Sequence, residues 1–204
     1  MSNLENKKFY DWIFSLYPTR WNNSSHPRGY HGIDIQILEL LSEFKKQNIR
    51  LIDLGCGNGR TLECVYRRNW KLYGVDFSEY AIIEARQRIQ PQINLLIADF
   101  TQLPFKNDSF DVVLSIGVHE HIDPIDFSEI ARILTNNGKA FIYLPIVEKS
   151  IGKNYTNTCY NKDMDDWGKH FQWDLSHEEW KIELQKSLKI LDFKEGFFIC
   201  SKGE

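Results

Sequence analysis

The chain has 204 residues, with 25 basic and 28 acidic side chains and a formal net charge of −3. This length can build one sizeable core, and the charge gives no general attraction to nucleic acid or anionic membrane. The four cysteines are Cys56, Cys64, Cys159 and Cys200. They show neither C-x-x-C nor zinc-type spacing, which favours a reducing compartment. Charged residues interrupt the N-terminus, and no apolar run approaches about 20 residues. We therefore expect a cytoplasmic protein without a membrane span.

Two helices are predicted at the start of the chain. Residues 4–17 place their apolar side chains close to one helical face, and residues 33–47 repeat this spacing. The stretch between them, residues 19–32, is rich in Asn, Ser, Pro, Arg and Gly and is predicted to be irregular. We expect residues 1–48 to form a helical cap or lid on a single domain that spans residues 1–204.

Short apolar runs and helical segments then alternate over residues 49–145. Strands are predicted at 50–54, 71–76, 93–98, 110–115 and 139–144, and helices at 60–68, 79–89 and 125–134. This alternation is typical of right-handed crossovers, a parallel sheet and helices on both of its faces. The expected fold is a Rossmann-like, doubly wound α/β core, in which ligands bind at the carboxyl ends of the strands.

The alternation ends after Pro145. Residues 146–175 mix aromatic and polar side chains, and we interpret them as an insertion on the substrate side. The sequence S-H-E-E from Ser176 is a predicted capping box for a helix that reaches about Ser187. Residues 189–193 and 197–201 are predicted as the last two strands, so that residues 176–204 supply the C-terminal helix and strands.

The most specific motif begins where the first predicted strand ends. It reads D-x-G-x-G-x-G, from Asp53 through Gly55 and Gly57 to Gly59. Glycines there let the backbone approach a ligand closely. A dinucleotide fingerprint would need glycine at Arg60, so the spacing disfavours NAD. The motif instead resembles motif I of the class I S-adenosylmethionine-dependent methyltransferases, in their small-molecule, methyltransferase type 11-like branch.

The resemblance extends over roughly residues 50–145. Residues 99–113 are similar to the family's link between its third and fourth strands, and residues 134–139 resemble its L-x-x-G-G turn. Asn137 replaces the first glycine of that turn, and Asn tolerates left-handed geometry. The resemblance implies a seven-stranded, mostly parallel sheet whose last strand is antiparallel. It also implies S-adenosyl-L-methionine as cofactor and S-adenosyl-L-homocysteine as product.

Acidic residues end the first three predicted strands of the core. The cofactor carries an ammonium group, a ribose diol and an adenine amino group, all of which need hydrogen-bond acceptors. We expect Asp53 to orient the ammonium, Asp76 to accept from the ribose hydroxyls and Asp99 to accept from the adenine. The other expected cofactor contacts are Gly55, Cys56, Gly57, Phe77, Phe100, Ser115 and Ile116. Helix capping is the alternative role for Asp53 or Asp76.

Methyl transfer needs little chemistry from the protein, because the sulfonium already activates the methyl group and positioning supplies much of the catalysis. A base is needed only where the nucleophile loses a proton. The loop after the fourth strand faces the transferred methyl in the family, so His119 and His121 are candidate bases, with packing as the alternative. Glu120 and His121 also resemble the end of an E-x-x-E-H metal motif, but its first position is Gly117. We expect no metal and keep that site as the minor alternative.

The acceptor pocket is expected to come from the N-terminal segment and the 146–175 insertion. Aromatic rings could exclude water and surround a cation, and an arginine could bind a carboxylate or phosphate, although packing and solvated loops are the plain alternatives. The predicted substrate-side residues are Tyr17, Trp21, Arg28, Tyr30, His119, Tyr155 and Trp167. The sequence thus predicts methyl transfer to an O or N atom of a small molecule. Methylation of a macromolecule (an RNA end or a protein) and non-catalytic binding of the adenosyl cofactor stay as alternatives, and the oligomeric state is left open.

Overall fold

The computed structural model describes residue 11 and residues 30–44, 48–67, 69–150, 152–156 and 170–203, with backbone alone for 30–34, 153–156 and 170–171. The helix predicted at 4–17 therefore lies outside the described residues, apart from Asp11. So does the irregular stretch up to residue 29. The described ranges contain the predicted core, residues 49–145, except residue 68.

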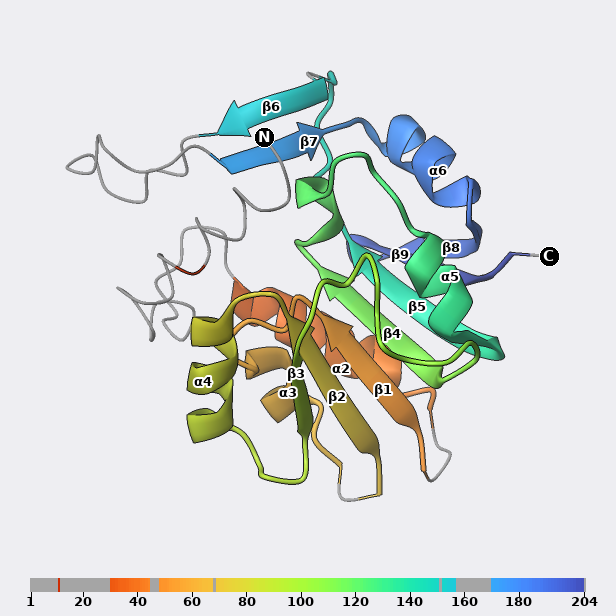
Figure 1. Ribbon diagram of the computed structural model, residues 1–204. Coiled ribbons are helices and arrows are strands. Elements are labelled where there is room, and N and C mark those ends of the chain that lie inside the picture. Colours follow the sequence, from red (N-terminus) through yellow and green to blue (C-terminus); the bar gives the residue numbers. More distant parts are fainter. Residues whose placement is uncertain are drawn as a thin grey trace.

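A seven-stranded sheet runs through the molecule in the order β3-β2-β1-β4-β5-β9-β8 (Figure 1). Strands β1 to β5 pair in parallel, whereas β9 is antiparallel to both β5 and β8. The mostly parallel sheet with an antiparallel last strand is thus confirmed. The strands are β1 (Arg50–Leu54), β2 (Lys71–Asp76), β3 (Asn94–Ile97), β4 (Phe110–Ile116), β5 (Leu134–Tyr143), β8 (Leu188–Lys194) and β9 (Phe197–Lys202).

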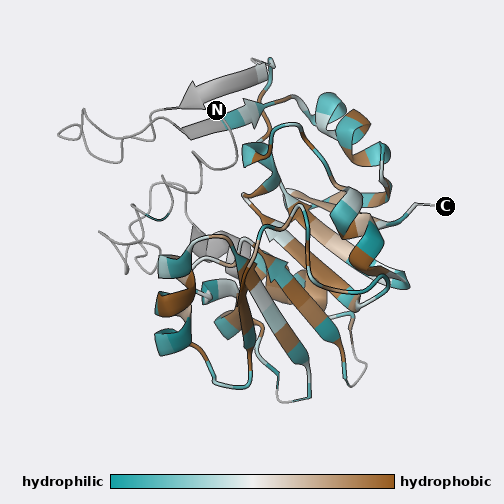
Figure 2. Cartoon of the chain, viewed as in Figure 1, coloured by the Kyte–Doolittle hydropathy of each residue, from teal (hydrophilic) through white to brown (hydrophobic). Residues whose placement is uncertain are grey.

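Helices cover both faces of this sheet. Apolar side chains of α2, α3 and α4 join one buried cluster, and those of α5 and α6 join another on the opposite face. Hydrophobic residues accordingly follow one another along the central strands (Figure 2), as expected for parallel strands buried on both faces. None of the described helices is long and apolar enough to cross a membrane. The helices are α2 (Tyr30–Leu41), α3 (Arg60–Cys64), α4 (Glu79–Arg88), the 3-10 turn η2 (His119–His121), α5 (Ser128–Ile133) and α6 (His177–Gln185).

The capping box predicted at Ser176 is present. Its hydroxyl accepts from the backbone N–H of Glu179 at 3.4 Å, and the Glu179 carboxylate accepts from the Ser176 N–H at 3.0 Å. Two donors that the first turn of α6 would otherwise leave open are thereby satisfied. The four residues from Ser176 to Glu179 were therefore sufficient to predict where α6 begins.

The insertion contains a hairpin that the sequence analysis did not predict. Strands β6 (Gly152–Thr156) and β7 (His170–Asp174) pair antiparallel to each other in a separate two-stranded sheet. The Trp173 indole N–H donates to the carbonyl oxygen of Ile122 at 2.9 Å, and β7 lies against η2. The strands are largely polar, so contact with η2 and mutual pairing specify them rather than an apolar alternation.

Several predicted bounds need correction, and α2 already differs from the helix predicted at 33–47 because it ends at Leu41. The helix predicted at 60–68 ends at Cys64, and the one predicted at 125–134 begins only at Ser128, whose N–H donates to the Asp126 carboxylate at 2.8 Å. Asn137 does not take the left-handed conformation that its place in the turn suggested. It belongs instead to β5, which begins at Leu134 beside a register shift in its pairing with β4.

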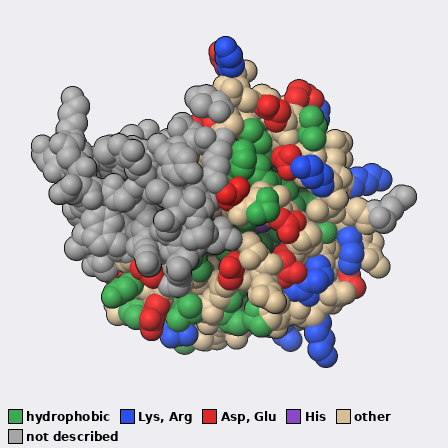
Figure 3. All heavy atoms as spheres, turned by 45° about the horizontal axis from the view of Figure 1, so that its top comes forward, with side chains coloured by type: hydrophobic (Ala, Val, Ile, Leu, Met, Phe, Trp, Pro, Cys, Tyr) green, Lys and Arg blue, Asp and Glu red, His purple; other side chains and the backbone are tan. Residues whose placement is uncertain are grey.

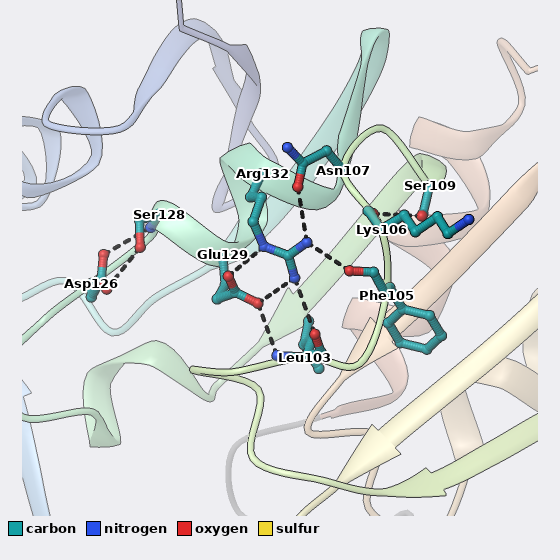
Figure 4. A network of polar contacts seen from close by, with 9 residues as sticks. All are labelled: Leu103, Phe105, Lys106, Asn107, Ser109, Asp126, Ser128, Glu129 and Arg132. Atoms are coloured by element: carbon teal, nitrogen blue, oxygen red, sulfur yellow. Dashed lines mark hydrogen bonds and ion pairs between the residues drawn. The ribbon is translucent and has the colours of Figure 1, made fainter.

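An arginine ties the loop between β3 and β4 to α5 (Figure 4). Arg132 donates to both carboxylate oxygens of Glu129, at 2.6 and 2.7 Å, and to the backbone oxygens of Leu103 and Phe105 at 3.1 and 2.6 Å. Glu129 also accepts from the Leu103 N–H at 2.8 Å. This network holds in place the loop that leaves the carboxyl end of β3.

We expect Glu129→Gln to lower the free energy of unfolding by about 1–3 kcal/mol at pH 7, because two charge-assisted hydrogen bonds weaken. The hydrogen bond from Arg132 holds the pKa of Glu129 below its usual range, against the opposing effect of desolvation. A depressed folded pKa gives stability that is present above the unfolded value and lost as the pH falls through the folded one. The difference from wild type should therefore shrink below about pH 4, which urea unfolding at pH 7, 5 and 3 measures.

The exposed Glu148→Gln is the control for this series, since it removes the same charge without a described partner. A Glu129→Gln effect no larger than that of the control at pH 7 would contradict the role of the network.

Candidate cofactor site

The glycine loop, residues 55–59, leaves the carboxyl end of β1 in a conformation that side chains would prevent. Gly55 and Gly59 have φ of 67° and 78°. A Cβ on Gly55 would lie 2.5 Å from a Val118 methyl, and one on Gly59 would lie 2.8 Å from an Ile89 methyl. Both positions thus combine left-handed backbone with a close neighbour. The loop brings bare backbone to the sheet edge where ligands of such folds bind.

The Asp76 carboxylate joins the end of β2 to the glycine loop. It is buried, and it accepts the N–H of Gly57 at 2.9 Å with one oxygen and the N–H of Ser78 at 2.9 Å with the other. Capping of α4 falls to the Ser78 hydroxyl, which accepts from the Ala81 N–H at 3.3 Å. Each carboxylate oxygen can accept a further hydrogen bond, so these contacts are compatible with a ribose diol.

Asp53 and Cys56 lie at the same strand end and are both buried. Asp53 pairs in register with Gly74 of β2 on one side and Leu114 of β4 on the other, in the middle of the sheet. Burial raises the pKa of the Cys56 thiol, and the negative charges of Asp76 and Asp53 raise it further. The thiol therefore stays protonated, which suits packing and not nucleophilic chemistry.

Asp99 follows β3 and is exposed. One of its oxygens accepts both the N–H and the hydroxyl of Thr101, at 2.9 and 2.7 Å. The next residue, Phe100, meets the ring of Phe77 edge to face with 6.3 Å between centroids. Phe77 itself follows Asp76, so an acid and then an aromatic ring stand at each of two adjacent strand ends.

Ser115, near the end of β4, and His119, in η2, form a buried pair. The serine hydroxyl lies 2.6 Å from His119 Nδ1, and the imidazole stacks on Phe127 with 4.8 Å between centroids and 14° between planes. Burial lowers the pKa of His119 to about 3. So low a pKa makes His119 a weak proton acceptor at neutral pH, which disfavours the role of base that the sequence suggested for it. Holding the loop in place suits this residue better.

Glu120 and His121, the pair behind the minor metal alternative, both belong to η2. Glu120 is buried, and its carboxylate lies 3.8 Å from His121 Nε2. Gly117, at the position of the missing carboxylate, would place a Cβ 3.5 Å from Glu120 Oε1. Among the side chains that the structure describes, no three His, Cys, Asp or Glu are grouped to hold an ion.

The acceptor side is only partly within the described residues. Tyr17, Trp21, Arg28 and Trp167 lie outside them, and the backbones of Tyr30 and Tyr155 belong to α2 and β6. Their substrate-side roles stay predictions. Figure 3 turns the top of Figure 1 forward. In this view hydrophobic side chains gather beside the grey atoms, and acidic side chains lie near the hydrophobic ones. Sequence reasoning did not anticipate that Trp173 of the insertion holds β7 to the end of η2 through its indole N–H. The only sign of this role in the sequence is an indole within a polar stretch.

Residues 52–142 match a family model described as a methyltransferase domain. The match begins in β1 and ends in β5, and it includes the glycine loop and all three acids. This part of the chain is a class I methyltransferase domain. Its cofactor is S-adenosyl-L-methionine, in agreement with the resemblance found in the sequence.

Two relatives of this methyltransferase domain act on very different molecules. The tRNA (carboxymethyluridine(34)-5-O)-methyltransferase of Saccharomyces cerevisiae is 36% identical over 105 residues, which cover 48% of this chain and 36% of that protein. The ubiquinone biosynthesis O-methyltransferase of Pelagibacter ubique is 34% identical over 101 residues, 47% of this chain and 42% of that protein. The matched region thus spans less than half of either relative's length.

A solved methyltransferase has the same fold over nearly the whole chain. The 1,6-didemethyltoxoflavin-N1-methyltransferase of Burkholderia thailandensis, solved with 1,6-didemethyltoxoflavin and S-adenosylhomocysteine bound, superposes with a TM-score of 0.73. The superposition covers 99% of this chain and 89% of that one at 13% identity. At that identity the likeness concerns the fold alone.

Proposed function

We propose that this chain binds S-adenosylmethionine and transfers its methyl group to an O or N atom of a small-molecule acceptor. The observation that carries the proposal is the set of three acids, Asp53, Asp76 and Asp99, at the carboxyl ends of β1, β2 and β3 beside the glycine loop. The cofactor has no phosphate, so acceptors and close backbone suit it better than an anion cradle. An ammonium, a ribose diol and an adenine amino group each meet an acid in this arrangement.

When bound, the cofactor supplies an activated methyl on a cationic sulfur. The chain's part is to bind, orient and exclude water. Asp53 would hold the methionine ammonium, Asp76 the ribose and Asp99 the adenine amino group, with the rings of Phe77 and Phe100 as apolar contacts. The backbone of the glycine loop and of Ser115 and Ile116, together with Cys56, would complete the cofactor contacts.

A small acceptor is favoured by the net charge of −3 and by the ubiquinone-pathway relative. A macromolecule, an RNA end or a protein, is the second candidate. The tRNA-modifying relative supports an RNA acceptor in general, and the lack of a basic stripe in the sequence weakens it. A chain that binds the cofactor without catalysis is the third candidate. The proposal includes a single domain with a 1–48 cap, a 49–145 core, a 146–175 insertion and a 176–204 C-terminal part, located in the cytoplasm.

Calorimetric titration with S-adenosylmethionine, S-adenosylhomocysteine and NADH tests the cofactor. We expect micromolar dissociation constants for both adenosyl ligands and no binding of NADH, because position 60 lacks the glycine of a dinucleotide site. Binding of NADH alone would refute the proposal.

Labelled methyl transfer in a cell extract then separates the acceptor classes. A small acceptor places the label in the low-molecular-mass fraction, an RNA acceptor places it in ribonuclease-sensitive material, and a protein acceptor in protease-sensitive material. Absence of transfer with intact cofactor binding would favour the non-catalytic candidate. Full activity in excess EDTA would exclude the minor metal alternative.

A further inference from the structure

Side chains from three different segments hold His119. Its Nδ1 shares a hydrogen bond with Ser115 at the end of β4, and its ring stacks on Phe127 just before α5. The ring of Phe100, which follows β3, lies 5.7 Å away between centroids. His119 itself belongs to η2, which lies between the end of β4 and β7 (Figure 1). One buried imidazole therefore links the ends of two strands with a helix.

The bond between Ser115 and His119 closes a short loop that touches the glycine loop. Val118 lies within the closed segment, and its methyl group occupies the space where a Cβ of Gly55 would stand, 2.5 Å away. The backbone turns at Gly117, whose φ is 67° and whose N–H donates to the Tyr143 oxygen at 3.1 Å. Val118 therefore meets the glycine loop from within the segment that the bond between Ser115 and His119 closes.

On its other side His119 leads toward the place proposed for the adenine. Phe100 contacts both His119 and Phe77, so three rings follow one another across the ends of β2, β3 and β4. Movement of the imidazole would shift the ring of Phe100, which follows Asp99, and through it the ring of Phe77. Contacts of His119 therefore reach both ends of the proposed cofactor site.

We propose that His119 is a positioning residue for the cofactor, which sets the glycine loop through Val118 and the adenine side through Phe100. This inference rests on the proposed binding of S-adenosylmethionine. It assigns His119 to orientation and not to proton removal. A buried, neutral ring also suits a site for a cationic ligand, because it adds no repelling charge.

Variants at both partners separate the hydrogen bond from the ring. His119→Phe keeps a ring but removes the bond, Ser115→Ala removes the hydroxyl, and His119→Asn keeps a polar atom near the position of Nδ1. We expect His119→Phe and Ser115→Ala each to weaken binding of S-adenosylhomocysteine about 10-fold, the size of a lost buried hydrogen bond. His119→Asn keeps a polar partner for Ser115 but loses the ring beside Phe100, so it should weaken binding by about threefold, less than the variants that remove the bond. The double variant Ser115→Ala/His119→Phe should be no weaker than His119→Phe alone, because both changes remove one bond.

Leu184→Ala in α6 is the control for lost stability, since this buried leucine belongs to the cluster on the face of the sheet opposite the cluster that contains Cys56 of the glycine loop. It should keep wild-type affinity at temperatures well below its unfolding midpoint. Wild-type affinity in both His119→Phe and Ser115→Ala would overturn the inference. So would a loss of methyl transfer with unchanged affinity, which identifies a base. If the wild-type protein binds neither adenosyl ligand, the proposed function itself fails and the inference falls with it.

Discussion

Gly55→Ala is expected to weaken S-adenosylmethionine binding by about 100-fold, the loss that a misplacement of about 1 Å can cause in a site built on positioning. The new Cβ would stand 2.5 Å from a Val118 methyl group, so either the valine or the loop must move. The φ of 67° adds left-handed strain that alanine tolerates poorly. Calorimetric titration with S-adenosylmethionine gives the affinity, and a thermal melt gives the accompanying loss of stability.

Two further variants separate the close contact from the backbone strain. Gly152→Ala has a similar φ of 77°, and among the described residues no atom lies within 4 Å of the new Cβ, so it carries the strain without a described close contact. It should cost about 1 kcal/mol of stability and leave cofactor affinity unchanged. Val118→Ala combined with Gly55→Ala removes the colliding methyl groups and should restore part of the affinity. Equal losses with and without Val118→Ala would show that this contact is not the cause.

The central strands could be predicted closely because local chemistry specifies them. In β1 the apolar residues Leu51, Ile52 and Leu54 are buried and the strand stops at a glycine-rich loop, and β2 ends at Asp76 before a helix cap. Burial on both faces makes such runs continuous, so their bounds are visible in the sequence. The hairpin of β6 and β7 has no such pattern, because its strands are polar and its docking depends on Trp173 reaching a distant carbonyl.

The candidate site divides in the same way. The acids at the strand ends were predictable, since the carboxyl ends of parallel strands meet at one edge of the sheet. The burial of His119 was not, because it arises from Phe127 and Phe100, which are brought to the imidazole only by the packing of α5 and the loop after β3. The sequence alone suggests an accessible base, because His119 follows Gly117 in a predicted loop and its aromatic neighbours are far away in the chain.

Asp76→Ala is expected to lower the free energy of unfolding by about 2–5 kcal/mol, because the buried N–H of Ser78 and the half-buried N–H of Gly57 lose their acceptor at about 1–3 kcal/mol each, with Gly57 toward the lower value. It should also weaken S-adenosylmethionine binding by about 100-fold, since the proposed ribose acceptor and the tether of the glycine loop disappear together. Asp76→Asn should fall between, because its amide keeps one acceptor oxygen and turns a donor toward the other N–H group.

Urea unfolding with and without saturating S-adenosylhomocysteine tests both roles of Asp76 at once. A ligand that binds only the folded state raises stability by an amount that grows with the logarithm of its concentration divided by its dissociation constant, so Asp76→Ala should gain less than wild type at the same ligand concentration. The control is Asp99→Asn, whose exposed carboxylate bonds only to Thr101 among the described residues, and it should unfold close to wild type without ligand. Unfolding of Asp76→Ala at the wild-type midpoint would contradict the tether. Lost stability with a wild-type gain from the ligand would instead limit Asp76 to a structural role, because the ribose would then have another acceptor.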